Sequence, residues 1–478
     1  MIPLTLREVA AAVGGTLVGG DPEIVVSGSV EFDSRQIGPG GLFVAFPGAT
    51  VDGHDFAPQA VQAGAVAVLG TRPTSGPTVV VDDPLAALGR LARVVVDRLP
   101  ELVIVGITGS SGKTSTKDMI VQLLARLGPT VGPAGSFNNE LGLPHTVLKA
   151  DQQTRFLVLE MGSRGTGHLT YLCQIAPPRI AVVVNVGVAH IGEFGSVDAI
   201  ATAKSELVAA LAPGGQAVLN ADDERVRAMA PLAEKAGAMV VFAGEAQDAT
   251  VHAEQVELDE RGRASYILRT PEGSRAVRLG ISGRHQSGNS LLAAAVARSA
   301  GMDLPELAAA LGELRLASTR RMDVFDRLDG VTVIDDSYNA NPASTAAALQ
   351  ALAAIGAGRR QVAVLGYLAE LGEQERDGHM QVGQLTAELG VHRLVVVGAQ
   401  AAPMDDGARA VPDWGGVSVV VSDQDAAVAW LRAELRPGDV VLVKGSRYRT
   451  WAVADQLRGE DFTVLPSADG SARPMVTS

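Results

Sequence analysis

The stretch LVIVGITGSSGKTST, residues 102–116, joins an apolar run to a glycine-rich loop and the start of a helical pattern. It fits the end of the phosphate-binding pattern G-x-x-x-x-G-K-[ST], although Ile107 stands where the first glycine belongs. Small residues let backbone N–H groups close around phosphate oxygens, and a helix N-terminus favours negative charge. The strand before the loop argues against an incidental glycine–serine turn. We therefore predict a nucleotide-binding loop of Thr108, Gly109, Ser110, Ser111, Gly112, Lys113, Thr114 and Ser115.

Apolar strands alternate with helical stretches on both sides of this loop. The strands expected around it are 102–107, 155–161, 180–186 and 216–220, and residues 249–280 alternate as antiparallel strands do. A second alternation follows, with strands at 331–335, 361–366, 393–398 and 439–445. Continuous apolar strands between helices are typical of a doubly wound parallel sheet covered on both faces. We predict an α/β fold with three domains: 1–98, a central sheet in 99–316, and a smaller Rossmann-like sheet in 317–478.

Composition narrows the class of protein. The 478 residues carry a formal net charge of −13 and show no basic run, which argues against a nucleic-acid partner. Cys173 is the single cysteine, so no intrachain disulfide is possible and a reducing compartment is indicated. No stretch approaches 18 uninterrupted apolar residues, and the N-terminus is unlike a secretory signal. The sequence predicts a cytoplasmic, monomeric globular protein without a membrane span.

A carboxylate follows the strand expected at 155–161. A magnesium–nucleotide site needs hard oxygen ligands, and ligands collect at the carboxyl ends of strands in such sheets. Glu160 stands at that position, and Asn185 and His190 follow the next strand. The alternative for Glu160 is a solvent-facing acid in a strand-to-helix turn, and a lone histidine after a strand is more often structural. The three polar residues together favour a metal site.

Lys204 lies on the apolar side of the helix predicted within VDAIATAKSELVAAL, residues 197–211. Helical spacing places it among Ile200, Ala203, Leu207, Val208 and Leu211. A desolvated lysine loses its charge more readily and becomes chemically modifiable. A lysine whose stem packs while its ammonium reaches water would show the same spacing. Spacing alone leaves both interpretations open.

Several motifs together resemble the Mur ligases. They are TGSSGKTS (108–115), EMG (160–162), NVGVAHIGEFGS (185–196), AKSEL (203–207), GRHQSGNSLLAAA (283–295) and DDSYNANP (335–342). The family consists of three-domain, ATP-dependent amide synthetases of peptidoglycan assembly. The segments 33–56, 136–148 and 335–344 are most similar to the member that joins D-alanyl-D-alanine to UDP-N-acetylmuramoyl-tripeptide. The resemblance covers residues 34–447, nearly the whole chain.

The resemblance implies ATP and two Mg²⁺ positions. Lys113 and Thr114 would serve the ATP phosphates and one Mg²⁺, with Glu160 as a ligand of the same ion. His190 and a carbamylated Lys204 would belong to the second metal position, and Lys113, His190 and Lys204 would form the catalytic set. Further nucleotide contacts would come from Asn289, Arg321, Asp336 and Asn339.

The resemblance also implies two substrate ends. Ser34, Arg35, Asn138 and Asn139 would lie at the uridine-nucleotide end. Asn341, Lys444, Ser446 and Arg447 would form the acceptor side, where the dipeptide carboxylate needs a cation. Three positions depart from the family pattern: Gln286 replaces an asparagine, the stretch around Arg321 matches only loosely, and Tyr367-Leu368 replaces an acidic residue and methionine.

The expected activity is amide-bond formation through an acyl phosphate, in cytoplasmic peptidoglycan precursor synthesis. The nearest alternative is another Mur-type amide ligase, which adds a single amino acid or extends a folate with glutamate. A nucleotide-gated binding protein and a P-loop kinase are alternatives of other classes. The position of Lys204 disfavours a gated binding protein, since such a switch has no need of a desolvated lysine. Substrate domains on both sides of the loop domain favour the joining of two substrates.

Overall fold

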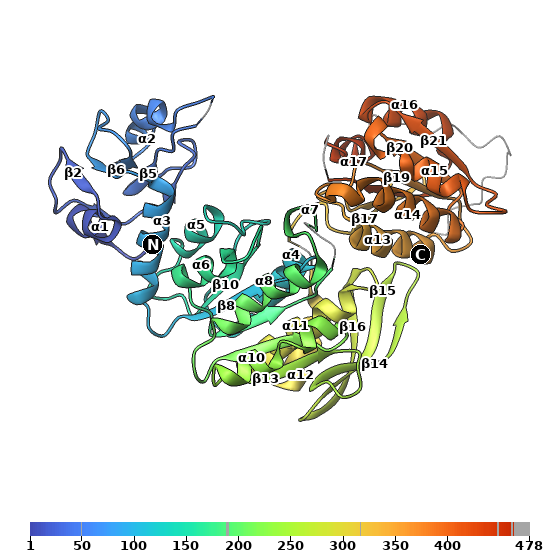
Figure 1. Ribbon diagram of the computed structural model, residues 1–478, viewed down its shortest axis with the longest axis horizontal. Helices are drawn as coiled ribbons and strands as arrows, with labels where there is room; N and C mark the ends of the chain where they lie inside the picture. Colours follow the sequence, from blue (N-terminus) through green and yellow to red (C-terminus); the bar gives the residue numbers. More distant parts are fainter. Residues whose placement is uncertain (49, 188–190, 316, 447–448, 460–461, 463–478) are drawn as a thin grey trace.

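The three larger β-sheets of the described residues each form the centre of one lobe. The computed structural model describes residues 1–48, 50–187, 191–315, 317–446, 449–459 and 462. The N-terminal lobe (blue) and the C-terminal lobe (orange and red) stand on either side of the central lobe (Figure 1). This mixed α/β architecture with mostly parallel sheets confirms the predicted fold class. The domain limits at 98/99 and 316/317 stay predictions.

The N-terminal lobe holds a five-stranded sheet that is parallel except at one edge. Its order is β2 (Thr16–Val18), β7 (Thr78–Val80), β6 (Ala65–Gly70), β5 (Gly41–Val44) and β4 (Val30–Glu31), with β2 antiparallel to β7. A small pair, β1 (Leu4–Thr5) and β3 (Val25–Val26), and the helices α1 (Leu6–Val13), η1 (Gly53–Phe56), α2 (Ala57–Gln62) and α3 (Pro84–Asp97) complete it. The Asp83 carboxylate caps α3 by accepting from the N–H groups of Leu85 and Ala86. Helix α3 then leads into the central lobe.

The central lobe is built on a nine-stranded sheet. Its order is β16 (Gly273–Ser282), β15 (Arg263–Thr270), β14 (Val251–Leu258), β13 (Met239–Gly244), β12 (Gln216–Asn220), β11 (Ile180–Val183), β8 (Val103–Thr108), β10 (Phe156–Glu160) and β9 (Thr130–Val131). The strands from β9 to β14 are parallel, while β14, β15 and β16 pair antiparallel. Because β8 lies between β10 and β11, third from the β9 edge, the loop that follows it starts from an interior strand of the sheet.

Helices cover both faces of this sheet. One core contains side chains of α4 (Lys113–Ala125), α11 (Gln286–Ser299) and α12 (Leu304–Glu313). The other contains side chains of α5 (Gly142–Val147), α6 (His168–Ile175), α8 (Val197–Ala209), α9 (Glu224–Arg227) and α10 (Ala230–Lys235). A short helix, α7 (Ile191–Phe194), precedes α8. The doubly wound arrangement explains why the parallel strands read as continuous apolar runs.

The C-terminal lobe has a six-stranded sheet. Its order is β17 (Asp323–Asp326), β18 (Thr332–Asp335), β22 (Val440–Lys444), β19 (Gln361–Leu365), β20 (Arg393–Val397) and β21 (Val417–Val421), with only β17 antiparallel. Side chains of α13 (Pro342–Ile355), α14 (Glu375–Glu388) and α15 (Pro403–Arg409) pack on one face, and those of α16 (Gln424–Glu434) and α17 (Trp451–Arg458) on the other. The 3₁₀ turn η2 (Gly372–Gln374) lies between β19 and α14, and η3 (Ala399–Ala401) lies between β20 and α15.

The predicted strands are present, with ends shifted by a few residues. Outside the N-terminal lobe, the strands that the sequence did not predict are β9, β13, β17 and β21. Both β17 and β21 are edge strands. The sequence of β17 is DVFD, and its two aspartates leave too short an apolar run to predict a strand. Within the described ranges, no helix is long and apolar enough to cross a membrane.

Candidate active site

The glycine-rich loop leaves the interior strand β8 and enters α4. Gly112, at the start of the helix, has a φ of +77°, which a residue with a side chain rarely adopts. A Cβ atom added at Gly112 would lie 2.8 Å from Asn289 Oδ1, and one at Gly109 would lie 2.8 Å from Val184 Cβ. Glycine at both positions therefore lets the loop pack against α11 and the end of β11.

Asn185 shapes the loop from the neighbouring strand end. Its Oδ1 accepts hydrogen bonds from the N–H groups of Ser110 (3.0 Å) and Ser111 (2.9 Å), and its Nδ2 donates to Ser111 O (3.2 Å). Its amide thus holds the loop, a role that the sequence did not indicate when it placed Asn185 with the metal candidates. The first N–H groups of α4 have no partner within the helix and suit an anion.

Lys113 lies at the first position of α4. Its ammonium donates to Gly109 O at 2.6 Å, so the side chain folds back over the loop. Burial lowers the pKa of Lys113, and the charge of Glu160 acts in the opposite direction. A lysine at this place can neutralise phosphate charge.

Glu160, at the end of β10, is the centre of a buried hydrogen-bond cluster. Its Oε2 accepts from Thr114 Oγ1 at 2.8 Å, and its Oε1 accepts from Ser136 Oγ at 2.7 Å and Asn138 Nδ2 at 2.8 Å. A hydroxyl and a carboxylate side by side at a phosphate loop fit Mg²⁺, which keeps several waters and takes few protein ligands. Within the described part of the chain, no three His, Cys, Asp or Glu side chains gather as a metal cluster. His190 lies outside the described residues.

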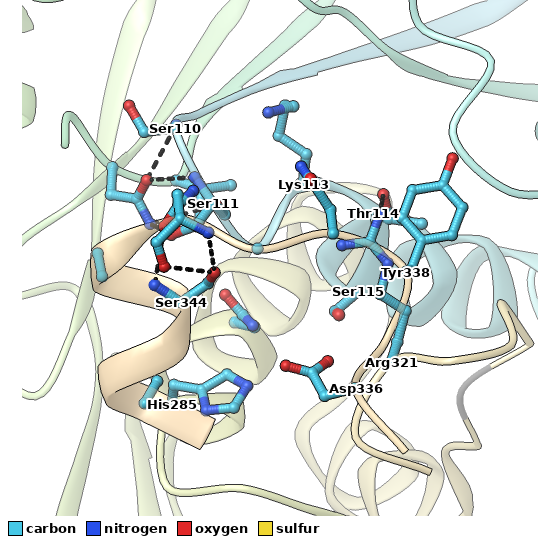
Figure 2. A pocket seen from close by; sticks show the side chains of 18 of the residues that line it. Ser110, Ser111, Lys113, Thr114, Ser115, His285, Arg321, Asp336, Tyr338 and Ser344 are labelled. Atoms are coloured by element: carbon cyan, nitrogen blue, oxygen red, sulfur yellow. Dashed lines mark hydrogen bonds between the residues drawn. The ribbon is translucent and has the colours of Figure 1, made fainter. Parts of the chain in front are cut away.

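Arg321 reaches this cluster from the linker to the C-terminal lobe. Its Nη2 donates to Thr114 Oγ1 at 3.3 Å, and its guanidinium carbon lies 4.2 Å from the centroid of the Tyr338 ring. Figure 2 shows Arg321 and Tyr338 beside Thr114, with Lys113 close by. The C-terminal lobe therefore brings a cation to the phosphate end of the cavity.

The loop 336–341 forms the C-terminal side of the cavity. Asp336 makes an ion pair with the buried ammonium of Lys444, which also donates to Asn339 O at 3.0 Å. Burial lowers the pKa of Lys444, and Asp336 opposes that effect. Asn341 caps α13, since its Oδ1 accepts from Ser344 N at 2.8 Å. Lys444 thus supports the loop, and its role toward a dipeptide carboxylate stays a prediction.

Lys204 on α8 is buried, with 3% of its surface exposed. Desolvation, and to a lesser degree the charge of Lys113, lower its pKa well below the ordinary value. The side chain therefore does not extend its ammonium freely into water, which was the alternative that helical spacing left open. Its place in a second metal position stays a prediction.

Other predicted residues have local partners. Ser34 Oγ donates to Gln59 Oε1 at 3.1 Å, and the exposed Arg35 pairs with Asp33, both in the N-terminal lobe. The remaining residues are engaged as follows: Asn139 Oδ1 accepts from Gly142 N, Ser446 Oγ donates to Tyr367 O, and Asn289 Nδ2 donates to Gln286 Oε1. Arg447 lies outside the described residues. The contacts of Asn138 are with Glu160 and Ser136, so its assignment to the uridine end stays a prediction.

The phosphate loop, the Glu160 cluster and the loop 336–341 surround one cavity of about 410 Å³ between the central and C-terminal lobes. Its lining does not include Ser34, Arg35, Asn139, Lys204 and Ser446. It is lined by most of the phosphate loop together with Glu160, Asn289, Arg321, Asp336, Asn339, Asn341 and Lys444. Tyr338, within the predicted nucleotide segment 336–339, also lines it, as do Ser136, His285 and Glu370, for which the sequence predicted no role. The histidine of GRHQSGN was the available signal for His285, whose Nδ1 is buried without a hydrogen-bond partner. Figure 2 shows many of the side chains that line this cavity.

Three family models match the chain. They are the Mur ligase family catalytic domain at residues 28–103, the Mur ligase middle domain at 107–297, and the Mur ligase glutamate ligase domain at 320–447. A curated protein of Mycobacterium tuberculosis is 47% identical over 99% of this chain and 100% of its own length. The chain belongs to the Mur ligase family.

Two relatives that match over nearly the whole chain carry the same name. Both the Mycobacterium tuberculosis protein and an Escherichia coli protein, 35% identical over 94% of this chain and 96% of its own, are named UDP-N-acetylmuramoyl-tripeptide--D-alanyl-D-alanine ligase. A crystal structure of MurF from Acinetobacter baumannii matches with a TM-score of 0.85 at 30% identity, covering 95% of this chain and 98% of that one. The MurF ligase of Thermotoga maritima in complex with ADP matches with a TM-score of 0.75 at 28% identity, covering 90% and 97%. The chain is therefore a ligase with the three-domain Mur architecture.

Proposed function

We propose that the chain is an ATP-dependent ligase that joins D-alanyl-D-alanine to the terminal carboxylate of UDP-N-acetylmuramoyl-tripeptide in cytoplasmic peptidoglycan precursor synthesis. The names of relatives that match over nearly the whole chain support the substrates, and the ADP complex of a related ligase supports the nucleotide. The single observation that carries the proposal is the shared cavity. Lys113, Thr114 and Glu160 of the central lobe meet Arg321 of the linker at one end of it.

The reaction begins with activation of a carboxylate, which is a poor acyl donor. A carboxylate oxygen of the tripeptide attacks the γ-phosphorus of ATP, the bond to the β–γ bridging oxygen breaks, and ADP leaves. Lys113 and Arg321 offset the negative charge on the transferring phosphoryl group. The groups that would hold Mg²⁺ are Thr114 and Glu160, and the ion would neutralise phosphate charge there.

The second step forms the amide bond. The amine nitrogen of D-alanyl-D-alanine attacks the acyl carbon, the carbon–oxygen bond to phosphate breaks, inorganic phosphate leaves, and the nitrogen loses a proton. Water would hydrolyse the acyl phosphate, so a cavity between two lobes that can close over it suits this intermediate. We expect the lobes to draw together when ATP and the nucleotide substrate are both bound.

Lys204 is the proposed site of a carbamate. A buried amine with a lowered pKa is more often in the neutral, reactive form, and carbamylation would turn it into an anionic oxygen ligand. We predict that Lys204→Ala folds normally but loses most activity, measured as ADP release. A short carboxylic acid such as acetate should restore part of that activity, whereas excess bicarbonate should not. Unchanged turnover in the variant would show that the lysine only packs.

The function is tested by omission of each reactant. Purified protein with ATP, Mg²⁺, UDP-N-acetylmuramoyl-tripeptide and D-alanyl-D-alanine should release inorganic phosphate and form the pentapeptide nucleotide, detected by mass spectrometry. Glutamate or diaminopimelate in place of the dipeptide should give no product, which separates this ligase from other Mur-type ligases. Absence of dipeptide-dependent phosphate release would refute the proposal.

A further inference from the structure

One face of the phosphate-loop helix carries the linker to the C-terminal lobe. Thr114, Asp118 and Gln122 follow one another at four-residue spacing on α4, which places them on the same side of the helix. The linker runs from the end of α12 at Glu313 to the start of β17 at Asp323. It therefore passes along the helix whose first turn belongs to the nucleotide site.

The contacts pair the two segments in antiparallel order. Gln122 makes two hydrogen bonds with the backbone of Arg315: its Oε1 accepts from the N–H at 3.0 Å, and its Nε2 donates to the carbonyl oxygen at 2.5 Å. Asp118 Oδ2 accepts from Ser318 N at 2.9 Å. Thr114 Oγ1 accepts from Arg321 Nη2 at 3.3 Å. The linker backbone is thus hydrogen-bonded to α4 at Arg315 and at Ser318, before the side chain of Arg321 contacts Thr114 at the phosphate end.

The Asp118 anchor is itself fixed. Its Oδ1 pairs with the ammonium of Lys117, which also donates to Pro133 O at 2.9 Å, and both side chains are almost completely buried. The paired charge explains how a carboxylate can be buried here. This leaves Oδ2 as an oriented acceptor for the linker. Neither Lys117 nor Asp118 takes part in the reaction proposed above.

Beyond Ser318 the linker is attached to the C-terminal lobe. Tyr338 N donates to Arg320 O at 3.3 Å, and Met322 N donates to Asp336 Oδ1 at 3.1 Å. Thr319 is the residue between the two sets of anchors. Arg320 and Met322 have φ values of +60° and +54°, a left-handed conformation that is strained for residues with side chains. The central lobe thus holds Arg315 and Ser318, and the C-terminal lobe holds Arg320 and Met322.

We propose that Asp118 and Gln122 are positioning residues that fasten the linker to the phosphate-loop helix and so fix the reach of Arg321 into the cavity. This inference rests on the proposed function for the role of Arg321. It predicts that loosening the linker lowers the rate of phosphoryl transfer without weakening nucleotide binding.

The test uses Gln122→Met, which keeps the length of the side chain and removes both hydrogen bonds to Arg315, together with the one from Nε2 to Asp118 O within α4. We expect kcat to fall about tenfold, as small displacements of a positioned group do, while the Kd of ADP changes less than about twofold. In an Arg321→Gln background the same substitution should lower kcat by less than about twofold, because the group that it positions is gone. Hydrogen exchange of the peptide 314–320 in the free protein should rise in Gln122→Met.

Arg126→Gln is the matched control. Arg126 lies one turn further along the same face of α4 and pairs with Glu313, the last residue of α12, before the linker begins. Its kinetics and its linker exchange should equal those of the wild type. Gln122→Glu, which keeps the acceptor for Arg315 N, should show an intermediate loss in kcat and serves if Gln122→Met does not fold.

Three results would overturn the inference. They are an unchanged kcat in Gln122→Met, effects of Gln122→Met and Arg321→Gln that multiply, and a loss of ADP affinity that parallels the loss in kcat. Failure of the proposed function appears separately, as a wild type without dipeptide-dependent turnover. In that case the exchange of residues 314–320 still decides whether Gln122 holds the linker.

Discussion

The central lobe meets its two neighbours in opposite ways. Toward the N-terminal lobe, α3 packs on α5 and α6 within one continuous apolar core, an interface that we call the apolar seam. Toward the C-terminal lobe, the cores stay separate, and the described contacts that join the lobes are mostly hydrogen bonds, ion pairs and backbone approaches. This polar seam includes Ser318 on Asp118, Arg261 paired with Asp326 at 2.6 Å, and Gly192 N on Glu370 O at 3.3 Å.

The difference separates stability from movement. Separation of the two lobes would expose the apolar side chains of this shared core to water, which costs free energy. The apolar seam therefore keeps the N-terminal and central lobes together. Polar contacts exchange with water at little net free energy, so the polar seam can open and close. The reactive cavity lies at the polar seam, where opening admits substrates and closing excludes water. Changes at the polar seam should therefore affect activity, and changes at the apolar seam should affect stability.

The largest effect is expected from Lys113→Ala at the polar seam. Removal of this cation should lower kcat by about 10²–10³-fold, roughly 2.7–4 kcal/mol of transition-state stabilisation. The thermal melting temperature should stay close to that of the wild type, because Lys113 is not part of a core. ADP release and a thermal melt measure the two quantities. Lys235→Ala, an exposed lysine on α10, is the control and should change neither.

Ile175→Ala should weaken the apolar seam. Ile175 on α6 lies against α3, where a Cβ atom added at Gly89 would come within 3.1 Å of its Cδ1. The cavity left by the truncation should lower the free energy of unfolding by about 2–4 kcal/mol, measured by urea denaturation. The kcat of the remaining folded protein should be unchanged. A tenfold loss in kcat with unaltered stability would reverse the assignment of the two seams.

Gly192→Ala should hold the polar seam open. A Cβ atom at Gly192 would lie 2.8 Å from Gly372 N and 2.9 Å from its Cα, so the two backbones could no longer approach. We expect kcat to fall about tenfold and small-angle scattering to show no compaction with an ATP analogue and the nucleotide substrate. Gly165→Ala, where the added atom would meet nothing within 4 Å, is the control. Normal compaction in Gly192→Ala would remove this contact from the closing mechanism.

The smallest effect is expected from Arg261→Gln. This substitution breaks an exposed ion pair across the polar seam, and such pairs contribute about 0–1 kcal/mol. The free energy of unfolding should change by less than about 1 kcal/mol in urea denaturation. A change as large as that of Ile175→Ala would mean that the polar seam also holds the fold together.

The sequence predicts this molecule best where the signal is local. The phosphate loop follows from a strand, two glycines and Lys113 in one short stretch, and the apolar position of Lys204 follows from helical spacing. The hydrogen bonds of Asn185 to Ser110 and Ser111 join residues about 75 positions apart, and only the strand order brings them together. Stacking of Arg321 on Tyr338 likewise depends on the linker path. Contacts between lobes, such as Gly192 with Gly372, have no periodic signature at all.

The central claim is that a carboxylate is phosphorylated in the cavity at the polar seam and then captured by an amine. The most direct measurement uses UDP-N-acetylmuramoyl-tripeptide labelled with ¹⁸O in its terminal carboxylate. The oxygen that attacks the γ-phosphorus stays on phosphorus when the amide forms. Inorganic phosphate released with ATP and D-alanyl-D-alanine should therefore carry one ¹⁸O atom, detected by mass spectrometry or ³¹P NMR. Phosphate without the label, formed together with the amide product, would contradict this mechanism.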